Sequence, residues 1–495
     1  MLVVENHPTE SGTIELRPSD FLEQTVPIAR DIFQRGSIRR STIERCVQIL
    51  HGYQEALREL GANDDTKLRA VATNILIESS NYDSFLNRVR IGCGIQIEPL
   101  DDGEMTRLIY LKTRRRLRDT PSMKRRTTLV IHAGPGNTRV LLFKNGRISD
   151  YTNYRLGVYR TNEAVRNNEG GEHLLNKNIR DHIRSLVSQI HNNYADSGLE
   201  EIVLLGYEIQ HFSHILTPPG KKQSSPEALA KLTKEVSAMS EETRVKKYQL
   251  DYNTAQAIIP ALEINLAIAN ALEVDVINLP GSDYERGLLL DLPASFSLTE
   301  GFQSEVIHSA QALAKKFNVH RSHSEQVTKL SQQIFERTTE LHQLNDHDAL
   351  LLTCAAILHE CGNFVSVRAH HKHSHYIISH SEIFGLGERD IAIIALIARY
   401  HRRSCPKMSH PPYRALQPKD RIRVSKLSAI LRVADALDRS HSSRISELTT
   451  RMDNQKLIIS LTGLSDISVE QRAMRSKSDL FHDIFGLRVT LEKNR

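Results

Sequence analysis

Apolar positions change between helical and strand-like spacing over the first three hundred residues. Residues 39–61 have the helical period, with a Ser/Thr–x–x–Glu capping box at the start and Gly61 at the end. Residues 67–76 are typical of a short buried strand that leads into a turn. Residues 95–116 follow as a strand, an acidic turn and a helix, so this region predicts mixed α/β structure.

The next apolar runs continue this alternation. Residues 127–157 predict a β-hairpin with a glycine-bearing turn, followed by a second turn at "KNG". Residues 199–212 predict a strand and a turn, and residues 252–292 predict a helix, a strand, a turn and a helix. Strands that alternate with helices indicate α/β architecture.

From about residue 300 the period becomes helical throughout. Five capped segments, 305–317, 322–341, 346–360, 388–403 and 423–440, predict an all-α domain. Two strand-like runs, 456–462 and 486–492, predict a small appended sheet. We therefore expect four parts, bounded as 1–122, 123–298, 299–445 and 446–495.

Composition narrows the class of protein. At 495 residues, 40% apolar and 25% charged, the chain is typical of a soluble protein with two to four domains. No stretch approaches the ~20 apolar residues of a membrane helix, so no membrane is expected as a partner. The five cysteines are scattered and odd in number, which indicates free thiols and a cytoplasmic location.

The charge indicates polyanionic partners. The net charge is +6, and basic residues gather in segments 112–126 and 399–444. Without tryptophan and with 5% aromatic residues, the chain lacks platforms for stacking nucleic-acid bases. A phosphate-rich ligand is therefore expected, and specific binding of nucleic acid is not.

A set of histidines and acids follows the order of an HD-type metal site. Six histidines lie between residues 355 and 385 alone. The proposed ligands are His323, His359, Glu360, His373, His401 and Asp435. Imidazole and carboxylate together suit a divalent ion such as Mg, Mn or Fe, which activates water against phosphorus. The remaining histidines, which include His371, are interpreted as loop or substrate contacts.

Glu360 departs from the usual His–Asp pair of such a site. The additional methylene moves the carboxylate by more than ~1 Å, a displacement that weakens a tight site. Glutamate still ligates metals, so Glu360 is kept as a ligand and as a catalytic candidate.

Nearly the whole chain resembles the exopolyphosphatase/guanosine-pentaphosphate phosphatase (Ppx/GppA) family. The motifs that carry the resemblance are "LHECG", "HHKHSHYII", "ARYHRR", "LRVADALDRSH" and "KSDLFHDIFGLRV", with weaker ones such as "LVIHAGPGNTRVLLF" before them. The resemblance implies a two-lobed actin-like (ASKHA, ribonuclease-H-like) domain followed by an HD domain. It also implies metal-dependent cleavage of terminal phosphoanhydrides in polyphosphate or pppGpp, and a homodimer.

The family's first active site carries over only in part. Its phosphate loop resembles D-I-G-G-G-S-T-E, of which this chain keeps Gly134, Gly136 and Thr138 but has Arg139 in place of the last acid. Met105 stands at the position of the catalytic glutamate, one residue after Glu104.

Two further positions of that site differ. Ile77 replaces an arginine of the family, and the family's opening strand and first phosphate turn are missing before "MLVVE". A miscalled start would account for the missing strand but would not restore the substituted positions.

Three functions are therefore open. The first is a phosphohydrolase that works at the HD metal site, with His371, Arg402 and Arg439 neutralising substrate charge. The second is exopolyphosphatase activity at the actin-like interface, with Glu104 as a displaced base. The third is a non-catalytic protein that binds polyphosphate or an alarmone.

Overall fold

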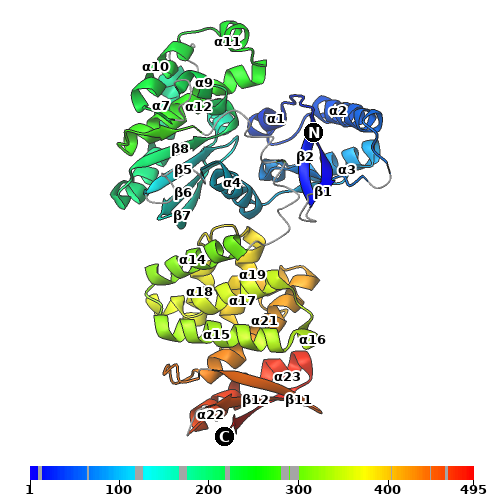
Figure 1. The fold of residues 1–495 in the computed structure, drawn as a ribbon, viewed down its shortest axis with the longest axis vertical. Helices are drawn as coiled ribbons and strands as arrows, with labels where there is room; N and C mark the ends of the chain where they lie inside the picture. The colour runs from blue at the N-terminus through cyan, green and yellow to red at the C-terminus, as the bar shows by residue number, and fades with distance from the viewer. Residues whose placement is uncertain are drawn as a thin grey trace. The chain divides into compact units, whose positions relative to one another are not determined.

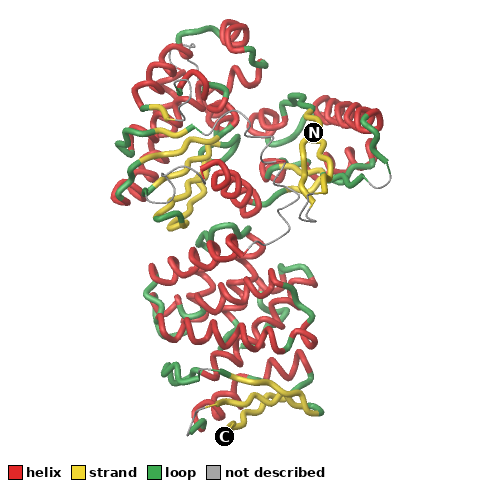
Figure 2. Tube along the Cα trace, viewed as in Figure 1, coloured by secondary structure: helices red, strands yellow, loops and turns green. Residues whose placement is uncertain are grey.

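The computed structural model describes residues 1–8, 14–63, 66–117, 126–166, 175–217, 223–279, 289, 300–402, 404–445, 447–462 and 466–494. These residues form two compact units, Met1–Ser297 and Leu298–Arg495. Figure 2 shows strands and helices mixed in the first unit, whereas the second is mainly helical. The α/β and all-α characters predicted for the two regions are confirmed. No described helix is long and apolar enough to cross a bilayer.

The first unit begins with small sheets and helices. The elements are β1 Leu2–Pro8, β2 Ile14–Phe21, α1 Ile28–Arg35, α2 Arg40–Glu59, β3 Ala70–Ala72, η1 Asn74–Glu78, α3 Tyr82–Cys93 and β4 Ile97–Pro99. β1 pairs antiparallel with β2, and β3 pairs parallel with β4. β3 is half-buried rather than buried, because its sheet has only these two strands.

Helix α2 differs from its prediction at the first turn. The helix begins at Arg40 with Arg39 as its N-cap, and no side chain caps it. The expected capping box is therefore absent, because the helix starts before the Ser/Thr positions that would have formed it.

The rest of the unit surrounds a six-stranded sheet. The elements are α4 Asp102–Leu117, β5 Thr128–Ala133, β6 Thr138–Lys144, β7 Arg147–Tyr154, α6 Val158–Arg166, α7 Leu175–Tyr194, η3 Ala195–Ser197, β8 Glu201–Leu205, α8 Tyr207–Gln210, α9 Ser213–Leu216, β9 Gln223–Ser224, α10 Pro226–Ser237, α11 Glu241–Tyr248, α12 Tyr252–Ala271 and β10 Ile277–Asn278. The strand order is β7-β6-β5-β8-β10-β9. Figure 1 shows β7, β6, β5 and β8 of this sheet next to one another. The predicted hairpin is confirmed, since β6 pairs antiparallel with both β5 and β7. The helix expected at the end of 252–292 lies almost entirely outside the described residues.

Helices bury both faces of this sheet. Leu142 faces the core that α7 and α12 complete. The next residue, Phe143, faces the other way, as alternate residues of a strand do. Its ring stacks on Tyr110 of α4, with centroids 6.1 Å apart. Each residue of β5 is consequently buried.

The second unit is a helical domain with a terminal sheet. Its elements are α14 Glu300–Lys316, α15 Arg321–Arg337, α16 Thr339–His342, α17 Asp346–Leu358, η5 Cys361–Phe364, α18 His370–Ser379, α19 Glu388–Arg399, α20 Pro411–Arg414, α21 Pro418–Leu437, β11 Leu448–Asp453, β12 Lys456–Thr462, α22 Ser468–Lys477, α23 Asp479–Phe485 and β13 Arg488–Asn494. α17 starts with a capping box between Asn345 and Asp348 and is buried almost all round.

The two predicted C-terminal strands are confirmed as β12 and β13, which pair parallel. A third strand, β11, pairs antiparallel with β12. Its largely polar sequence, LTTRMD, lacks the apolar alternation that would have identified it.

Candidate functional site

Three side chains from distant segments meet inside the helical unit. His323 lies in the first turn of α15, His359 directly follows α17, and Asp435 lies in the last turn of α21. All three are buried, and their ligand atoms lie within 4.8 Å of one another. Two imidazoles and a carboxylate at this separation are a donor set for a divalent ion.

Local packing fixes the ends of these helices. The Ser324 hydroxyl donates to the Ile357 carbonyl at 3.0 Å, which joins the start of α15 to the end of α17. The Ser374 hydroxyl donates to the His359 carbonyl at 2.8 Å and accepts from the Gly362 amide at 2.9 Å. A Cβ on Gly362 would lie 2.1 Å from the His370 carbonyl oxygen, so only glycine permits η5 to approach α18 this closely.

The orientation of the two imidazoles leaves one nitrogen of each available. His359 Nδ1 is 2.7 Å from the Ala356 carbonyl oxygen, and His323 Nδ1 is 2.7 Å from Asp438 Oδ2. Because these oxygens accept hydrogen bonds, Nδ1 carries the proton and Nε2 has the lone pair. Both Nε2 atoms are buried without a hydrogen-bond partner. Metal-ligating histidines have the same arrangement.

A second pair of imidazoles adjoins the first. His401 Nδ1 and His370 Nδ1 lie 2.6 Å and 3.2 Å from backbone carbonyl oxygens. Their Nε2 atoms face each other at 3.2 Å, and the rings of His359 and His401 are 5.0 Å apart. Burial lowers the pKa of both His370 and His401.

If both imidazoles are neutral, the lone pairs on the two Nε2 atoms point at each other and repel. A cation between the two atoms would relieve this repulsion. Two nitrogens bound to one ion at about 2.0–2.1 Å in tetrahedral geometry are separated by a little over 3 Å. The spacing of this pair is therefore compatible with two ligands of one ion.

A lysine neutralises the carboxylate of the cluster. Lys477, the last residue of α22, forms a buried ion pair with Asp435. Burial raises the pKa of Asp435, but the charge of Lys477 and the neighbouring imidazoles outweigh it, and the net shift is downward. Arg432, fully buried, donates to the Lys477 carbonyl oxygen at 2.8 Å and pairs with Asp479. The C-terminal segment is thus part of this site.

Glu360 belongs to a second, overlapping group. Its carboxylate lies within 4.8 Å of ligand atoms of His323 and His441. The His441 ring stacks on His323 with centroids 3.6 Å apart. The glutamate therefore reaches the edge of the cluster rather than its centre.

The other predicted residues of this unit are arranged around the cluster. His373, on α18, belongs to neither group of potential ligands. His371 is half-buried, and burial followed by the charges of His370 and Arg402 lowers its pKa to about 4. Arg402 thus lies near the imidazoles, whereas Arg439 is exposed just after the end of α21.

The glycine-bearing turn of the first unit is closely packed. The Thr138 hydroxyl donates to the Leu156 carbonyl at 2.5 Å, and Gly134 closes the turn onto Asn137 at 2.9 Å. A Cβ on Gly157 would lie 2.3 Å from Gly136 Cα, so the chain itself covers the turn. The Gly136 carbonyl accepts from Arg160 Nε at 2.9 Å. These groups are used within the protein.

Ion pairs also engage the acids beside this turn. Arg139, 3% exposed, pairs with Asp102, and Glu104 pairs with Arg69 at 3.2 Å. Met105 is buried against Leu100 and Leu108.

Sequence reasoning missed four residues of the helical site: His370, Asp438, His441 and Lys477. The motif "HHKHSH" offered several adjacent histidines without indicating which one points inward. "ALDRSH" did contain Asp438 and His441 close to Asp435. Lys477 is the first residue of the motif "KSDLFHDIFGLRV", but nothing in that motif indicated that the lysine would reach Asp435.

Comparisons with known proteins cover almost all of this chain. The family model "Ppx/GppA phosphatase family" matches residues 21–296, and "Ppx/GppA phosphatase, domain III" matches residues 307–480. Among curated relatives, the guanosine-5'-triphosphate,3'-diphosphate pyrophosphatase of Photobacterium profundum is 21% identical over 92% of this chain and 90% of its own length. That of Vibrio atlanticus is 22% identical over 94% and 91%.

Solved structures match at lower coverage. The Aquifex aeolicus member of the Ppx/GppA family is 17% identical with a TM-score of 0.42, covering 59% of this chain and 93% of that chain. An exopolyphosphatase from Cytophaga hutchinsonii is 14% identical with a TM-score of 0.46, covering 59% and 93%.

Proposed function

Since this chain belongs to the Ppx/GppA phosphatase family, as its resemblance implied, we propose that it hydrolyses terminal phosphoanhydrides at the histidine cluster of the helical unit. The substrate class is inorganic polyphosphate or a pppGpp-like nucleotide, as the names of the relatives suggest. The helical unit is interpreted as an HD domain, and the first unit as the actin-like domain of the family. A cytoplasmic location and a homodimer stay predictions from sequence.

One observation carries the proposal: the buried Nε2 atoms of His323 and His359 lack hydrogen-bond partners and lie beside Asp435. An orphaned acceptor of this kind costs free energy unless a cation or proton occupies it. The donors fit a borderline metal such as Mn, Fe or Zn better than Mg, which prefers oxygen ligands. Such an ion supplies Lewis acidity toward a phosphoryl oxygen and a more acidic water.

The surrounding residues would orient the substrate. Arg402 lies near His371 and His370, and the side chains of Arg402 and His371 would donate to a terminal phosphate bound at the cluster. Lys477 adds one buried positive charge. Glu360, half-buried at the edge, is positioned to accept a proton from attacking water. Asp438 holds His323 in the tautomer that presents Nε2.

The test compares two histidines that were both predicted from the sequence to be metal ligands. His359→Gln removes a cluster residue, whereas His373→Gln changes a histidine outside both ligand groups. We expect the first variant to lose bound metal, measured by mass spectrometry of the purified protein, and phosphate release from tripolyphosphate. The second should keep both. Equal metal content in the two variants, with melting temperatures showing both folded, would refute the proposal.

A second candidate is a protein that binds polyphosphate or an alarmone without turnover. The Lys477–Asp435 ion pair favours it, because an ammonium neutralises the only carboxylate of the central group. The pairing of Arg139 with Asp102 likewise leaves a cation where the family has an acid. Salt-sensitive affinity without phosphate release in any divalent metal would establish this alternative.

The third candidate, catalysis by Glu104, has the weakest support. Its carboxylate is paired with Arg69, and its backbone amide is capped by Asp101 at 2.8 Å. The carboxylate and the amide of Glu104 are therefore both engaged within the protein.

A further inference from the structure

A second feature of the first unit points to an anion-binding site separate from both candidate centres. A pocket of about 260 Å³ lies between the start of α1 and the start of α2. Its lining consists of Pro27, Arg30, Asp31, Arg39, Ser41, Thr42 and Arg45. Three arginines and one carboxylate therefore line the pocket, and its lining includes no aromatic residue.

The carboxylate is already committed to the protein. Asp31, 2% exposed, accepts from the Thr42 hydroxyl at 2.6 Å and from the Arg39 amide at 3.0 Å. Arg39 Nε lies 3.1 Å from its other oxygen. Asp31 thus fixes the approach of α1 to α2 and neutralises one guanidinium.

The other two arginines remain uncompensated. Within the described ranges, no carboxylate pairs with Arg30 or Arg45. Arg30 Nε is buried without a hydrogen-bond partner. A buried donor of a charged group that lacks a partner in the protein costs free energy unless a ligand or a water supplies the acceptor.

Backbone amides at the start of α2 add hydrogen-bond donors that carry partial positive charge. Helix α2 has 20 residues, and no side chain caps its N-terminus. The amides of Arg40, Ser41 and Thr42 have no carbonyl four residues earlier within the helix. They lie at the positive end of a long helix dipole, where anions bind favourably. The Ser41 hydroxyl is an additional donor at this end.

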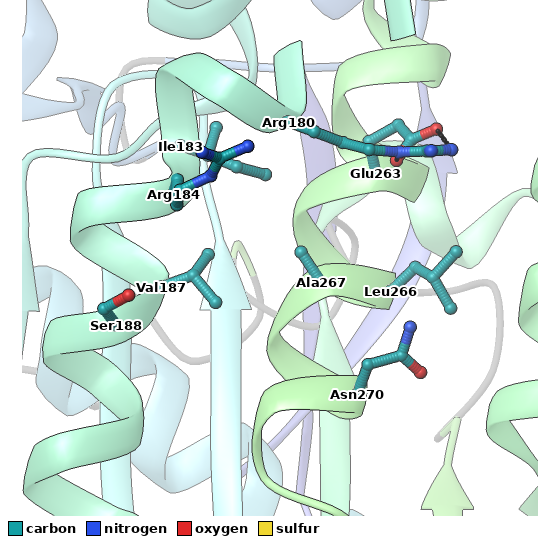
Figure 3. A pocket seen from close by; sticks show the side chains of 9 residues that line it. All are labelled: Arg180, Ile183, Arg184, Val187, Ser188, Glu263, Leu266, Ala267 and Asn270. Carbon is teal, nitrogen blue, oxygen red and sulfur yellow. Dashed lines mark hydrogen bonds and ion pairs between the residues drawn. The ribbon is translucent and has the colours of Figure 1, made fainter. Parts of the chain in front are cut away.

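A larger hollow of the same unit provides the contrast. A hollow of about 460 Å³, open to solvent on one side, lies between α7 and α12. Figure 3 shows the residues that line it. There Arg180 makes a bidentate ion pair with buried Glu263, at 2.8 and 2.9 Å, and Arg184 pairs with Asp181. Between these charges the lining is apolar, with Ile183 and Leu266. Arginines line both hollows. Of these two hollows, only the pocket at α1 and α2 contains two arginines that form no ion pair with a carboxylate among the described residues.

We propose that the pocket formed by Arg30, Arg39, Arg45 and the first turn of α2 binds a phosphoryl group of inorganic polyphosphate. Guanidinium groups and helix amides match phosphate geometry. The absence of aromatic side chains from the described lining disfavours a nucleic-acid strand, which would need its bases stacked. The site contains no residue of the proposed catalytic cluster, so it anchors a chain whether or not that cluster hydrolyses it.

The experiment measures binding of tripolyphosphate to the full chain by titration calorimetry, with a chelator present so that no divalent ion contributes. Arg30→Gln with Arg45→Gln should weaken binding at low salt by about tenfold or more, because two charge-assisted contacts are lost. The single variant Arg45→Gln, at an exposed position without an ion pair among the described residues, should weaken it less and keep the fold. Arg184→Gln, in the hollow between α7 and α12, is the control and should leave binding unchanged.

Two results would overturn the proposal. The first is unchanged affinity in Arg45→Gln and in the double variant, or an equal loss in Arg184→Gln. The second is a single-stranded oligonucleotide that binds more tightly than tripolyphosphate and loses its affinity in the same variants. That outcome would assign the pocket to the nucleic-acid backbone.

Discussion

Two regions of this chain have the residue types of a phosphate-processing site, and they differ in what those residues contact. At the turn between β5 and β6, the glycines and Thr138 remain, but Thr138 donates to a carbonyl and Arg139 pairs with Asp102. In the helical unit, His323 and His359 direct buried nitrogens at Asp435 without hydrogen-bond partners. Asn137 Oδ1 and Arg139 Nε of the turn are also buried without hydrogen-bond partners, but they belong to no group of potential metal ligands among the described residues. What distinguishes the helical unit is therefore that its unpartnered atoms form a donor set for a cation.

The two regions also differ in how their charges are balanced. The turn of the first unit has a nearly buried guanidinium opposite a partly exposed carboxylate. In the cluster, Lys477 neutralises Asp435, but the carboxylates of Asp438 and Glu360 also lie beside His323. Burial lowers the pKa of His359 and His401, so these imidazoles add no positive charge at neutral pH. The Arg139 and Asp102 charges beside the turn are therefore paired with each other, whereas the carboxylates around the histidine cluster can still bind a cation.

The largest difference should appear on removing one group from each region. His323→Gln should lower phosphate release by about 100-fold or more, because an imidazole donor and its Asp438 support are both lost. Asp102→Asn should change it by less than about twofold. Rates measured with tripolyphosphate under manganese supplementation test this. A larger loss in Asp102→Asn would reverse the comparison.

Removing the cation of the cluster should have the next largest effect. Lys477→Met leaves the Asp435 carboxylate uncompensated, and we expect Mn²⁺ to bind about tenfold more tightly, because repulsion of one buried positive charge is relieved. Equilibrium dialysis of Mn²⁺ measures the change. Lys426→Met, which removes an amine that donates to the His342 carbonyl, is the matched control. Weaker binding in Lys477→Met would show that the lysine supports the metal instead.

Acid should weaken the helical unit. Burial, with nearby positive charges, lowers the pKa of His371 and His375 from 6.5 to about 4. Between these values the unfolded chain binds protons that the folded one does not, so the free energy of unfolding falls as pH decreases from 6.5 toward 4. Calorimetry at about pH 7.5 and about pH 5 should show one transition moving to lower temperature.

A double variant identifies that transition. His371→Gln with His375→Gln should reduce the pH dependence, because two of the histidines whose pKa is lowered by folding are absent. A transition that does not move between the two pH values, or that moves equally in the variant, contradicts the assignment.

The smallest effect is expected at the ion pair of α4. Glu104→Gln breaks the contact with Arg69, and the Glu104 side chain is 29% exposed. The expected loss of stability is about 0.5 kcal/mol, with phosphate release unchanged within about twofold. Denaturant titration and the tripolyphosphate assay measure both. A large loss of activity would restore the actin-like interface as the catalytic centre.

Local patterns predicted most of the elements. The hairpin β5–β6–β7 followed from alternating residues and glycine-bearing turns, and α17 from its caps. The start of α2 was wrong by two residues, because a capping box is only a local preference and the packing of Asp31 on Thr42 fixed the actual start. β11 was missed because a partner strand, rather than its own sequence, stabilises it.

Less of the candidate site could be predicted from the sequence. His323, His359, His401 and Asp435 followed from order along the chain, and the structure brings them near one another. That His370 rather than His373 faces His401 depends on the angle at which α18 packs against Gly362. Lys477 reaches Asp435 through the tertiary contact of α22 with α21. These contacts join residues that are far apart in the sequence, so the periodicity of apolar positions does not predict them.

The most direct test is to locate manganese in crystals of the full chain by anomalous diffraction. We expect a peak within bonding distance of His323 Nε2, His359 Nε2 and the Asp435 carboxylate, about 2.0–2.2 Å from each. No anomalous peak should appear at Asp102 or Glu104. A peak at those two acids, or none at the cluster after saturating manganese, would contradict the assignment of the metal to the helical unit.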